Sequence, residues 1–410
     1  MLGTLLGHNM YTEIKGQNVP IRIWAPVDEV EAGALAQLKN VAALPWVIHH
    51  VVALPDVHFG KGATIGSVIV MQGAVSPSAV GVDLGCGVLA ARTNLKADHL
   101  PDSLRDTRLQ IERDVPTGFN EHQDASLITG CRLPSDLRMA VNEHLREFST
   151  LSMGKDRRME DKAWKQVGTL GGGNHFIEML LDKEQRVWIV LHSGSRYTGN
   201  KLAEYHTDQA MKLPHNADLP DRTLSALLVG SDAFRSYWSD LIWAQRYAEL
   251  NRSAILELVL LGLRRQFHAL AVEEVIACHH NYAQTENEWG PLSIVTRKGA
   301  ISAKAGEMGV IPGSMGGATH IVRGLGSENS FRSAAHGAGR RMSRGEAKRT
   351  FSKDDVETQT AGVECRKDRG IVDEVPGAYK DITKVMEQQR DLVESVAELK
   401  GIMVIKDSKE

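Results

Sequence analysis

The sequence has 410 residues, of which 42% are hydrophobic, and a formal net charge of −3. A chain of this length can bury a sizeable core. It contains nothing close to the roughly 18 uninterrupted apolar residues of a membrane-spanning helix. Because the net charge is slightly negative, any nucleic-acid binding would need local basic patches. Four cysteines without regular spacing do not form a disulfide framework, and residues 1–17 lack the basic start and apolar block of an export signal, so we expect a cytoplasmic protein.

Short apolar runs, most of them bounded by glycine, proline or charge, predict strands along the chain. In chain order these are Pro20–Trp24, Trp46–Leu54, Ser67–Met71, Val187–Leu191, Ser293–Thr296 and Ile402–Ile405. Apolar residues at intervals of three and four predict helices. In chain order these are Val30–Ala43, Leu137–Phe148, Asp232–Gln266, Ser343–Phe351 and Ile382–Leu399. Strands and helices are interspersed without a regular βαβ order, which predicts an α+β fold rather than a doubly wound sheet.

The chain shows no sign of division into separate domains. It contains no internal repeat, no low-complexity segment and no long Pro/Gly/Ser linker, so we expect a single catalytic domain over residues 1–410. The segment from about 106 to 135 is polar and weakly patterned, which predicts a loop-rich excursion from this domain. The aromatic residues of the longest helical pattern, including Trp238 and Tyr247, are expected in the core.

Glycine gathers around histidine, aspartate, cysteine and asparagine in six places. These are Pro55–Gly62 (PDVHFGKG), Gly81–Gly87 (GVDLGCG), Gly168–Glu178 (GTLGGGNHFIE), Leu191–Arg196 (LHSGSR), Pro312–Gly317 (PGSMGG) and His336–Arg340 (HGAGR). Glycine beside a reactive side chain lets the backbone approach a ligand closely and leaves N–H groups free for phosphate oxygens. Tight turns explain single clusters, but the six together favour a ligand site. None is a known phosphate loop, because GxxxxGK[ST] is absent and GTLGGGN matches GxGxxG only loosely.

Candidate metal ligands stand in or beside these segments. Asp83 and Cys86 are three residues apart in one glycine-rich turn, so a carboxylate and a thiolate could reach one ion. His175, His192 and the pair His279–His280 lie in or directly after other apolar or glycine-rich runs. Taken singly, each histidine is better explained by a structural or surface role. Together, one aspartate, one cysteine and three histidines suffice for two ions that share the thiolate, and two ions roughly 3.5–4 Å apart are typical of phosphoryl chemistry.

A series of short sequence motifs resembles those of the RtcB RNA-splicing ligases, also called 3′-phosphate RNA ligases. The motifs are PDVHFGKG, GVDLGCG, GGGNHFIE, LHSGSR, CHHNY, TRKGAISA, IPGSMGG, HGAGR, VECRKD and a C-terminal VIK, in the order of that family, across about Leu54–Lys406. The interval Asp106–Thr150 does not match. The resemblance implies a compact α+β domain around a deep metal- and nucleotide-binding cleft.

The resemblance also implies roles for individual residues. Two Mn²⁺ ions would be held by Asp83, Cys86, His175, His192 and His280, with Cys86 bridging, and His336 would be the catalytic nucleophile that takes GMP from GTP. The implied guanylate pocket consists of Asn174, His175, Phe176, Ile177, Glu178, His280, Asn281, Pro312, Gly313, Ser314, Met315, Thr319, His336, Gly337, Ala338, Gly339, Tyr379 and Lys406. In it, Glu178 would accept hydrogen bonds from the guanine edge and Lys406 would help to seat the base.

The implied reaction joins RNA ends. A 3′-phosphate, or a 2′,3′-cyclic phosphate after hydrolysis, would take the GMP, and a 5′-hydroxyl would then displace it. The implied partners are RNA and GTP, with an archease-type helper as a further candidate and tRNA splicing or RNA repair as the setting. The densest basic stretch, Arg340, Arg341, Arg344, Lys348 and Arg349, reads equally well as an RNA-phosphate track or a solvated helix face. Lys61 and Arg196 are further candidates for terminal phosphates.

Three residues differ from the usual pattern of the family, and two other functions remain as alternatives. Ala335 and Thr319 stand where the family usually has serine, and His320 where it has an aromatic or apolar residue, which concerns nucleotide affinity rather than the reaction class. A metallohydrolase such as a cyclic phosphodiesterase would use the same two metals without a nucleotide. A catalytically inactive RNA-binding or chaperone protein would need neither His336 nor the metal ligands.

Overall fold

The computed structural model describes residues 10–407, which build two large sheets. The first has the strand order β1-β2-β3-β4-β12-β11, with bounds Thr12–Ile14, Ile21–Ile23, Val47–His58, Ile65–Gln72, Ser293–Lys298 and Asn281–Thr285. The second has the order β10-β6-β8-β7-β17-β15-β14, with bounds Val272–His279, Gly87–Lys96, Arg186–Ser193, Phe176–Leu181, Val393–Ile405, Ala318–Gly324 and Met308–Pro312. Two short pairs are β13 with β16 (Ala300–Ser302, Ser333–Ala335) and β5 with β9 (Ala74–Val75, Leu227–Leu228). This mixture of largely antiparallel sheets and helices confirms the predicted α+β class.

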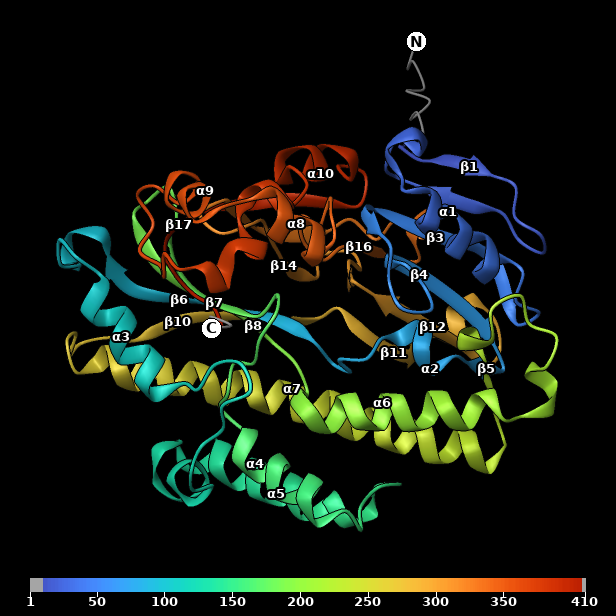
Figure 1. The fold of residues 1–410 in the computed structure, drawn as a ribbon, viewed down its shortest axis with the longest axis horizontal. Helices are drawn as coiled ribbons and strands as arrows, with labels where there is room; N and C mark the ends of the chain where they lie inside the picture. The colour runs from blue at the N-terminus through green and yellow to red at the C-terminus, as the bar shows by residue number, and fades with distance from the viewer. Residues whose placement is uncertain (1–9, 408–410) are drawn as a thin grey trace.

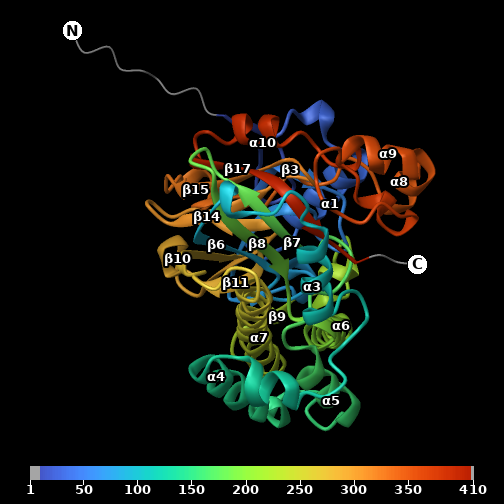
Figure 2. The same ribbon diagram turned by 90° about the vertical axis from the view of Figure 1, so that its left-hand side faces the viewer.

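The α-helices lie outside the sheets (Figure 1). They are α1 (Ala32–Ala42), α2 (Pro77–Val80), α3 (Arg105–Asp114), α4 (Ser135–Arg146), α5 (Arg157–Gln166), α6 (Arg196–Met211), α7 (Asp232–Arg264), α8 (Arg344–Thr350), α9 (Lys353–Gln359) and α10 (Ile382–Gln388). The long helix α7 runs beneath the second sheet, and α4 and α5 lie on its far side in both views (Figures 1 and 2). Therefore α7 is covered on two sides, which explains its many apolar positions.

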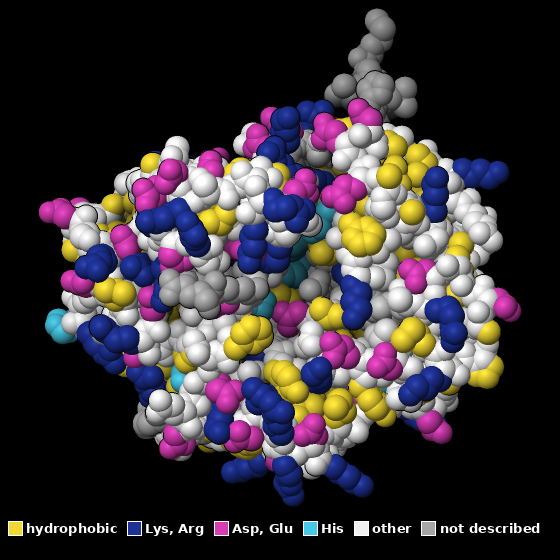
Figure 3. All heavy atoms as spheres, viewed as in Figure 1, with side chains coloured by type: hydrophobic (Ala, Val, Ile, Leu, Met, Phe, Trp, Pro, Cys, Tyr) yellow, Lys and Arg dark blue, Asp and Glu magenta, His cyan; other side chains and the backbone are white. Residues whose placement is uncertain are grey.

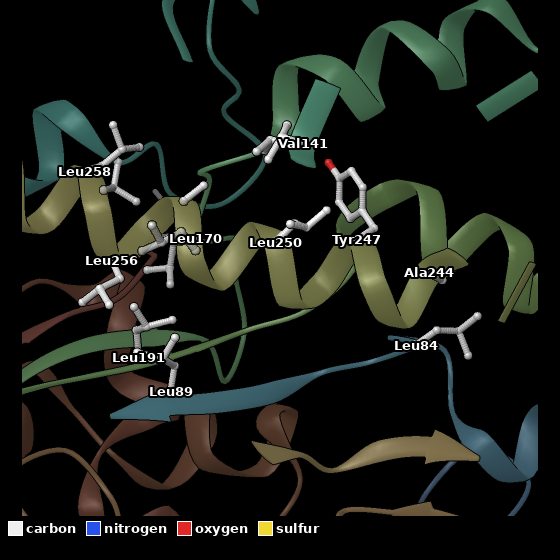
Figure 4. Close-up of a cluster of buried hydrophobic side chains, with 14 of the residues drawn as sticks. Leu84, Leu89, Val141, Leu170, Leu191, Ala244, Tyr247, Leu250, Leu256 and Leu258 are labelled. Carbon is white, nitrogen blue, oxygen red and sulfur yellow. The ribbon is translucent and has the colours of Figure 1, made fainter. Parts of the chain in front are cut away.

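The largest core cluster lies along α7. The Ser231 hydroxyl caps this helix by accepting from the Phe234 N–H at 3.1 Å. Leu89 of β6 and Leu191 of β8 face Leu256 of α7 (Figure 4). Burying one aliphatic side chain of this size contributes about 1.5–3 kcal/mol, so this layer holds the second sheet firmly against α7. Within residues 10–407, no helix combines the length and hydrophobicity that a membrane span requires.

Most predicted elements are confirmed, but the C-terminal region was predicted wrongly. The proposed helix Ile382–Leu399 ends at Gln388 as α10, and Val393 begins strand β17. β17 lies between β7 and β15, which supply backbone hydrogen bonds on both of its edges. Those partners decide the conformation of a segment whose local pattern also fits a helix. The segment from about 106 to 135 contains α3 and is therefore less loop-rich than expected.

The ends of several strands converge where the two sheets meet. β10 ends at His279 in the second sheet and β11 begins at Asn281 in the first, so His280 is the single residue between them. At the same level Gly87 opens β6 and pairs with Ser193, which closes β8. The chain therefore carries several of the predicted ligands to one place.

Candidate active site

A cavity of roughly 350 Å³ opens where the strand ends converge. Its wall includes glycine-rich segments from across the sequence and four histidines, His58, His192, His280 and His336. Figure 3 shows histidine side chains inside a hollow on this face, with lysine and arginine side chains on either side of it. A cavity of this size with a few convergent polar groups is typical of a small-molecule or nucleotide site.

The five predicted metal ligands lie together at the cavity floor. Asp83 and Cys86 occupy the turn before β6, His175 directly precedes β7, His192 lies in β8 and His280 joins β10 to β11. They form two groups of three, Asp83–Cys86–His175 and Cys86–His192–His280, and within each group the candidate ligand atoms lie within 4.8 Å of one another. Cys86 belongs to both groups, which is the arrangement expected of a bridging thiolate.

The donor atoms of this cluster point at one another. Cys86 Sγ lies 3.4 Å from His175 Nε2 and 3.2 Å from His192 Nε2. His175 Nε2 is 3.0 Å from Asp83 Oδ2, and His192 Nε2 is 3.1 Å from His280 Nε2. His175 Nδ1 donates to the Leu170 carbonyl at 2.9 Å, which leaves its Nε2 lone pair free for a ligand. Lone pairs that converge in this way are best satisfied by a cation.

Burial sets the protonation states of the cluster. Burial lowers the pKa of His192 and of His280 far below the usual value, so both rings are neutral and able to ligate. Burial, and then the neighbouring Asp83 carboxylate, raise the pKa of the Cys86 thiol. Burial opposes ionisation of Asp83, but the hydrogen bond and charge of His175, together with Cys86 and Arg196, outweigh it and lower the pKa of that carboxyl. A mixed set of one thiol, one carboxyl and three imidazoles fits transition-metal ions.

The predicted nucleophile lies beside this cluster. His336 directly follows β16, and its ring centroid is 4.7 Å from that of His280. Its Nδ1 lies 2.6 Å from Oδ2 of Asp56, a fully buried residue of β3. Because a carboxylate accepts this bond, Nδ1 carries the proton and Nε2 keeps its lone pair. Sequence reasoning assigned no role to Asp56, although it stands in the first glycine-rich block.

Most of the predicted guanylate pocket lines the cavity. These residues are Asn174, Phe176, Glu178, His280, Asn281, Pro312, Gly313, Ser314, Met315, His336, Gly337, Ala338, Gly339, Tyr379 and Lys406. His175 belongs to the candidate metal-ligand cluster and does not line the cavity. Ile177 packs in the core on the opposite face of β7, since neighbouring residues of a strand alternate, and Thr319 is buried in β15 away from the cavity.

The three departures from the family pattern lie outside the cavity wall, and one of them, Ala335, directly precedes His336. Ala335, Thr319 and His320 do not line the cavity. His320 Nδ1 lies 2.9 Å from the Ser395 hydroxyl, and the Ala335 N–H donates to the Gln389 side chain at 2.9 Å. His320 is therefore held by a side-chain contact within the fold.

A second charged group, centred on Glu374, also lines the cavity. Lys406 Nζ is 2.8 Å from Glu374 Oε2, the Tyr379 hydroxyl donates to the same oxygen at 2.6 Å, and Arg344 pairs with both Glu374 and Asp373. Burial opposes ionisation, but Lys406 and then Arg344 lower the pKa of Glu374 to about 2. Sequence reasoning missed both acidic residues, because they lie outside the glycine-rich blocks.

These contacts divide the predicted RNA-phosphate track. Arg340 and Arg344 turn inward, and Arg340 also donates to the Asp373 carbonyl at 2.8 Å. Arg341, Lys348 and Arg349 are exposed. They are the part of the stretch that stays available to a ligand.

The two other phosphate candidates also differ in accessibility. Lys61 is exposed at the edge of the cavity. Arg196 is half-buried beside the metal cluster and donates to the Thr169 hydroxyl at 3.1 Å and to the Gly118 carbonyl at 3.0 Å. Lys61 is therefore the better placed of the two to meet a phosphate that enters the cavity.

Comparison with known proteins gives consistent matches over nearly the whole chain. The family model described as tRNA-splicing ligase RtcB matches residues 37–407. The chain is 45% identical to the RNA-splicing ligase RtcB of Escherichia coli (strain K12), an alignment that covers 97% of this chain and 99% of the relative. It is 31% identical to the tRNA-splicing ligase RtcB of Nanoarchaeum equitans, over 95% of each chain, and 29% identical to that of Methanococcus maripaludis, over 92% of each.

Proposed function

The chain belongs to the RtcB family of tRNA-splicing ligases, and from this premise we propose that it joins RNA 3′-phosphate or 2′,3′-cyclic phosphate ends to 5′-hydroxyl ends, using GTP and two Mn²⁺ ions. One observation carries the proposal. His336 is oriented by the buried carboxylate of Asp56 and lies ring-to-ring at 4.7 Å from His280 of the metal-ligand cluster. A nucleophile, its orienting acid and a cation site thus adjoin one nucleotide-sized cavity.

In the first step His336 attacks the α-phosphorus of GTP. The Asp56 contact holds the proton on Nδ1, so Nε2 is the nucleophilic atom. The Nε2–phosphorus bond forms as the bond to pyrophosphate breaks, which leaves a histidine–GMP phosphoramidate. Splitting one difficult displacement into two easier ones is the usual benefit of covalent catalysis.

The five clustered side chains supply the cation site for this step. Asp83, Cys86 and His175 would hold one ion, and Cys86, His192 and His280 the other. Ions held there would neutralise the negative charge that develops on the phosphorus oxygens. The neutral imidazoles and the buried thiol fit this role because a bound cation offsets the cost of ionising the thiol.

Two residues of the cavity wall recognise the base. They are Glu178, which lies in β7, and Lys406, which directly follows the neighbouring strand β17. An ionised Glu178 accepts from the N–H groups that guanine, but not adenine, presents on that edge. Burial raises the pKa of Glu178 to about 8, so a bound guanine must favour the carboxylate.

The remaining steps transfer GMP and close the RNA. The RNA 3′-phosphate attacks the phosphorus of histidine–GMP and regenerates His336, which gives an activated RNA 3′-end. The 5′-hydroxyl of the second RNA then attacks the 3′-phosphate and expels GMP. Lys61, exposed at the cavity edge, is placed to hold the terminal phosphate.

Incubation with α-labelled GTP and Mn²⁺ tests the proposal. The wild-type chain should acquire an acid-labile covalent label, and His336→Ala should lose both the label and RNA joining. His268→Ala, an exposed histidine outside the cavity wall, is the matched control and should label normally. An unlabelled wild-type chain that still opens 2′,3′-cyclic phosphates would instead identify a metallohydrolase that uses no nucleotide.

A further inference from the structure

Lys380 makes an unusual set of contacts beside the nucleophile. Its Nζ donates to the carbonyl of Pro55 at 3.0 Å and to that of Val57 at 2.7 Å, the residues on either side of Asp56. Its backbone N–H donates to the Gly339 carbonyl at 2.9 Å, in the loop that follows His336. One residue thus connects the segment of Asp56 to the segment of His336.

The Asp56 segment needs such support because the sheet is irregular there. The regular register between β3 and β4 is interrupted between Ala53 and His58. Lys380 therefore supplies hydrogen bonds in a stretch of β3 where the ladder is broken. The carbonyl of Asp56 itself accepts from His58 Nδ1 at 2.8 Å, so three consecutive carbonyls are held by side chains.

The Asp56 carboxylate is also incompletely satisfied. Its Oδ2 lies 2.6 Å from Nδ1 and accepts from the backbone N–H of His336 at 3.3 Å, whereas its Oδ1 is buried with no hydrogen-bond partner among the described residues. A Cβ on Gly66 would stand 2.7 Å from that Oδ1, so the space beside it is closed. The ammonium of Lys380, fixed on both neighbouring carbonyls, supplies positive charge to this segment.

We propose that Lys380 is a positioning residue for guanylylation of His336: by clamping the backbone on both sides of Asp56, it sets the carboxylate that orients the nucleophile. The inference rests on the function proposed above and extends it to a residue outside the cavity wall. Burial lowers the pKa of Lys380, and the Asp56 carboxylate opposes this shift, as a cation facing that acid should.

The proposal predicts which chemical steps depend on Lys380. His336 acts in the attack on GTP and in the transfer of GMP to the RNA 3′-phosphate. It does not act as a nucleophile when a 5′-hydroxyl displaces GMP from an end that is already activated. A loss of positioning should therefore slow the first two steps and spare the third.

The test measures the steps separately in the full chain with Mn²⁺. For Lys380→Met we expect the rate constant of GMP labelling at saturating GTP to fall by about 10- to 100-fold, the loss typical of a misplaced catalytic group. The KM for GTP and the sealing of RNA that already carries a 3′-guanylate cap should stay close to wild type. Lys380→Arg, which keeps the charge and the donors, should restore part of the labelling rate.

Two further variants make the test specific. Lys384→Met, an exposed lysine of α10 four residues away, is the matched control and should label normally. Adding Lys380→Met to Asp56→Asn should slow labelling no further, because both changes act through the same carboxylate. If Lys380→Met does not fold, Lys380→Gln provides the same comparison.

Several outcomes would overturn the inference. Normal labelling by Lys380→Met, an equal loss in sealing of capped RNA, or additive effects with Asp56→Asn would each show that Lys380 does not act through His336. A wild-type chain that takes no label from GTP would instead contradict the proposed function itself.

Discussion

The two sides of the cavity balance their charges in different ways. On one side Asp83, Cys86 and three histidines turn their donor atoms toward one another, an arrangement that a cation completes. On the other side Glu374 accepts from Lys406 and Tyr379 and pairs with Arg344, so the protein balances these charges itself. The comparison teaches that the candidate metal-ligand cluster would depend on a bound cation, whereas the Glu374 group, which we propose to serve the nucleotide, is already balanced by its own contacts.

The largest effect should follow from Cys86→Ala, because both ligand groups share this thiol. We expect loss of bound Mn²⁺ and a fall in joining activity of roughly 100-fold or more. Removing a residue that only supports a metal ligand typically costs about 10- to 100-fold, and removing a ligand itself should cost at least as much. The rise in Tm that Mn²⁺ gives the wild type should also disappear. Elemental analysis and thermal unfolding measure this, with Cys278→Ala as the matched control. Two bound Mn²⁺ per chain in Cys86→Ala would place the bridge elsewhere.

On the nucleotide side, Glu374→Gln should destabilise the chain even without ligands. Removing this acid leaves Lys406 and Arg344 without their shared partner in a buried site, which costs about 3–5 kcal/mol of unfolding free energy. Denaturant unfolding of the metal-free chain measures the loss. Glu394→Gln, which breaks an exposed pair with Arg323, should cost less than about 1 kcal/mol. Equal stability of Glu374→Gln and wild type would mean that the nucleotide side is not balanced by this acid.

A smaller and more selective effect is expected for Lys406→Ala. This lysine lines the cavity, and we propose that it contacts the base, so GTP use should weaken by about 10- to 100-fold, as for the loss of one charged hydrogen bond. Ligation of RNA that already carries the guanylate cap should weaken far less. Parallel assays with GTP and with capped RNA measure the ratio, and equal losses would place Lys406 outside the nucleotide site.

The smallest effect concerns pH. Because burial raises the pKa of Glu178 to about 8, this carboxyl is protonated in the empty pocket at neutral pH. If guanine binds to the carboxylate, GTP affinity should rise with pH, by about tenfold for each unit below pH 7, and level off above pH 8. Calorimetry on His336→Ala, which cannot react, should detect about one proton released per GTP at pH 7. Adding Glu178→Gln to His336→Ala should remove this pH dependence. A GTP affinity of His336→Ala that does not change with pH would show that guanine does not require the carboxylate.

The sequence indicated the candidate metal ligands better than the acidic residues that support the rest of the cavity. Asp83, Cys86 and His175 stand in glycine-rich segments, which can be recognised in the sequence without knowledge of the fold. The acids that orient or balance other groups have no such signal, since Asp56 meets His336 across 280 positions of sequence and Glu374 meets its partners only in the folded chain. The joining of β17 to β7 and β15 escaped prediction for the same reason. Local pattern identifies reactive residues, and tertiary pairing decides which of them support one another.

The path of the donor phosphate tests the central claim most directly. If His336-bound GMP passes to an RNA 3′-phosphate, the 5′-hydroxyl attacks that phosphate and carries it into the new linkage. RNA labelled at its 3′-phosphate or 2′,3′-cyclic phosphate should therefore give a joined product with the label protected at the junction, in a reaction that requires GTP and Mn²⁺. Joining of a 3′-hydroxyl end to a 5′-phosphate end by the same chain would contradict the account.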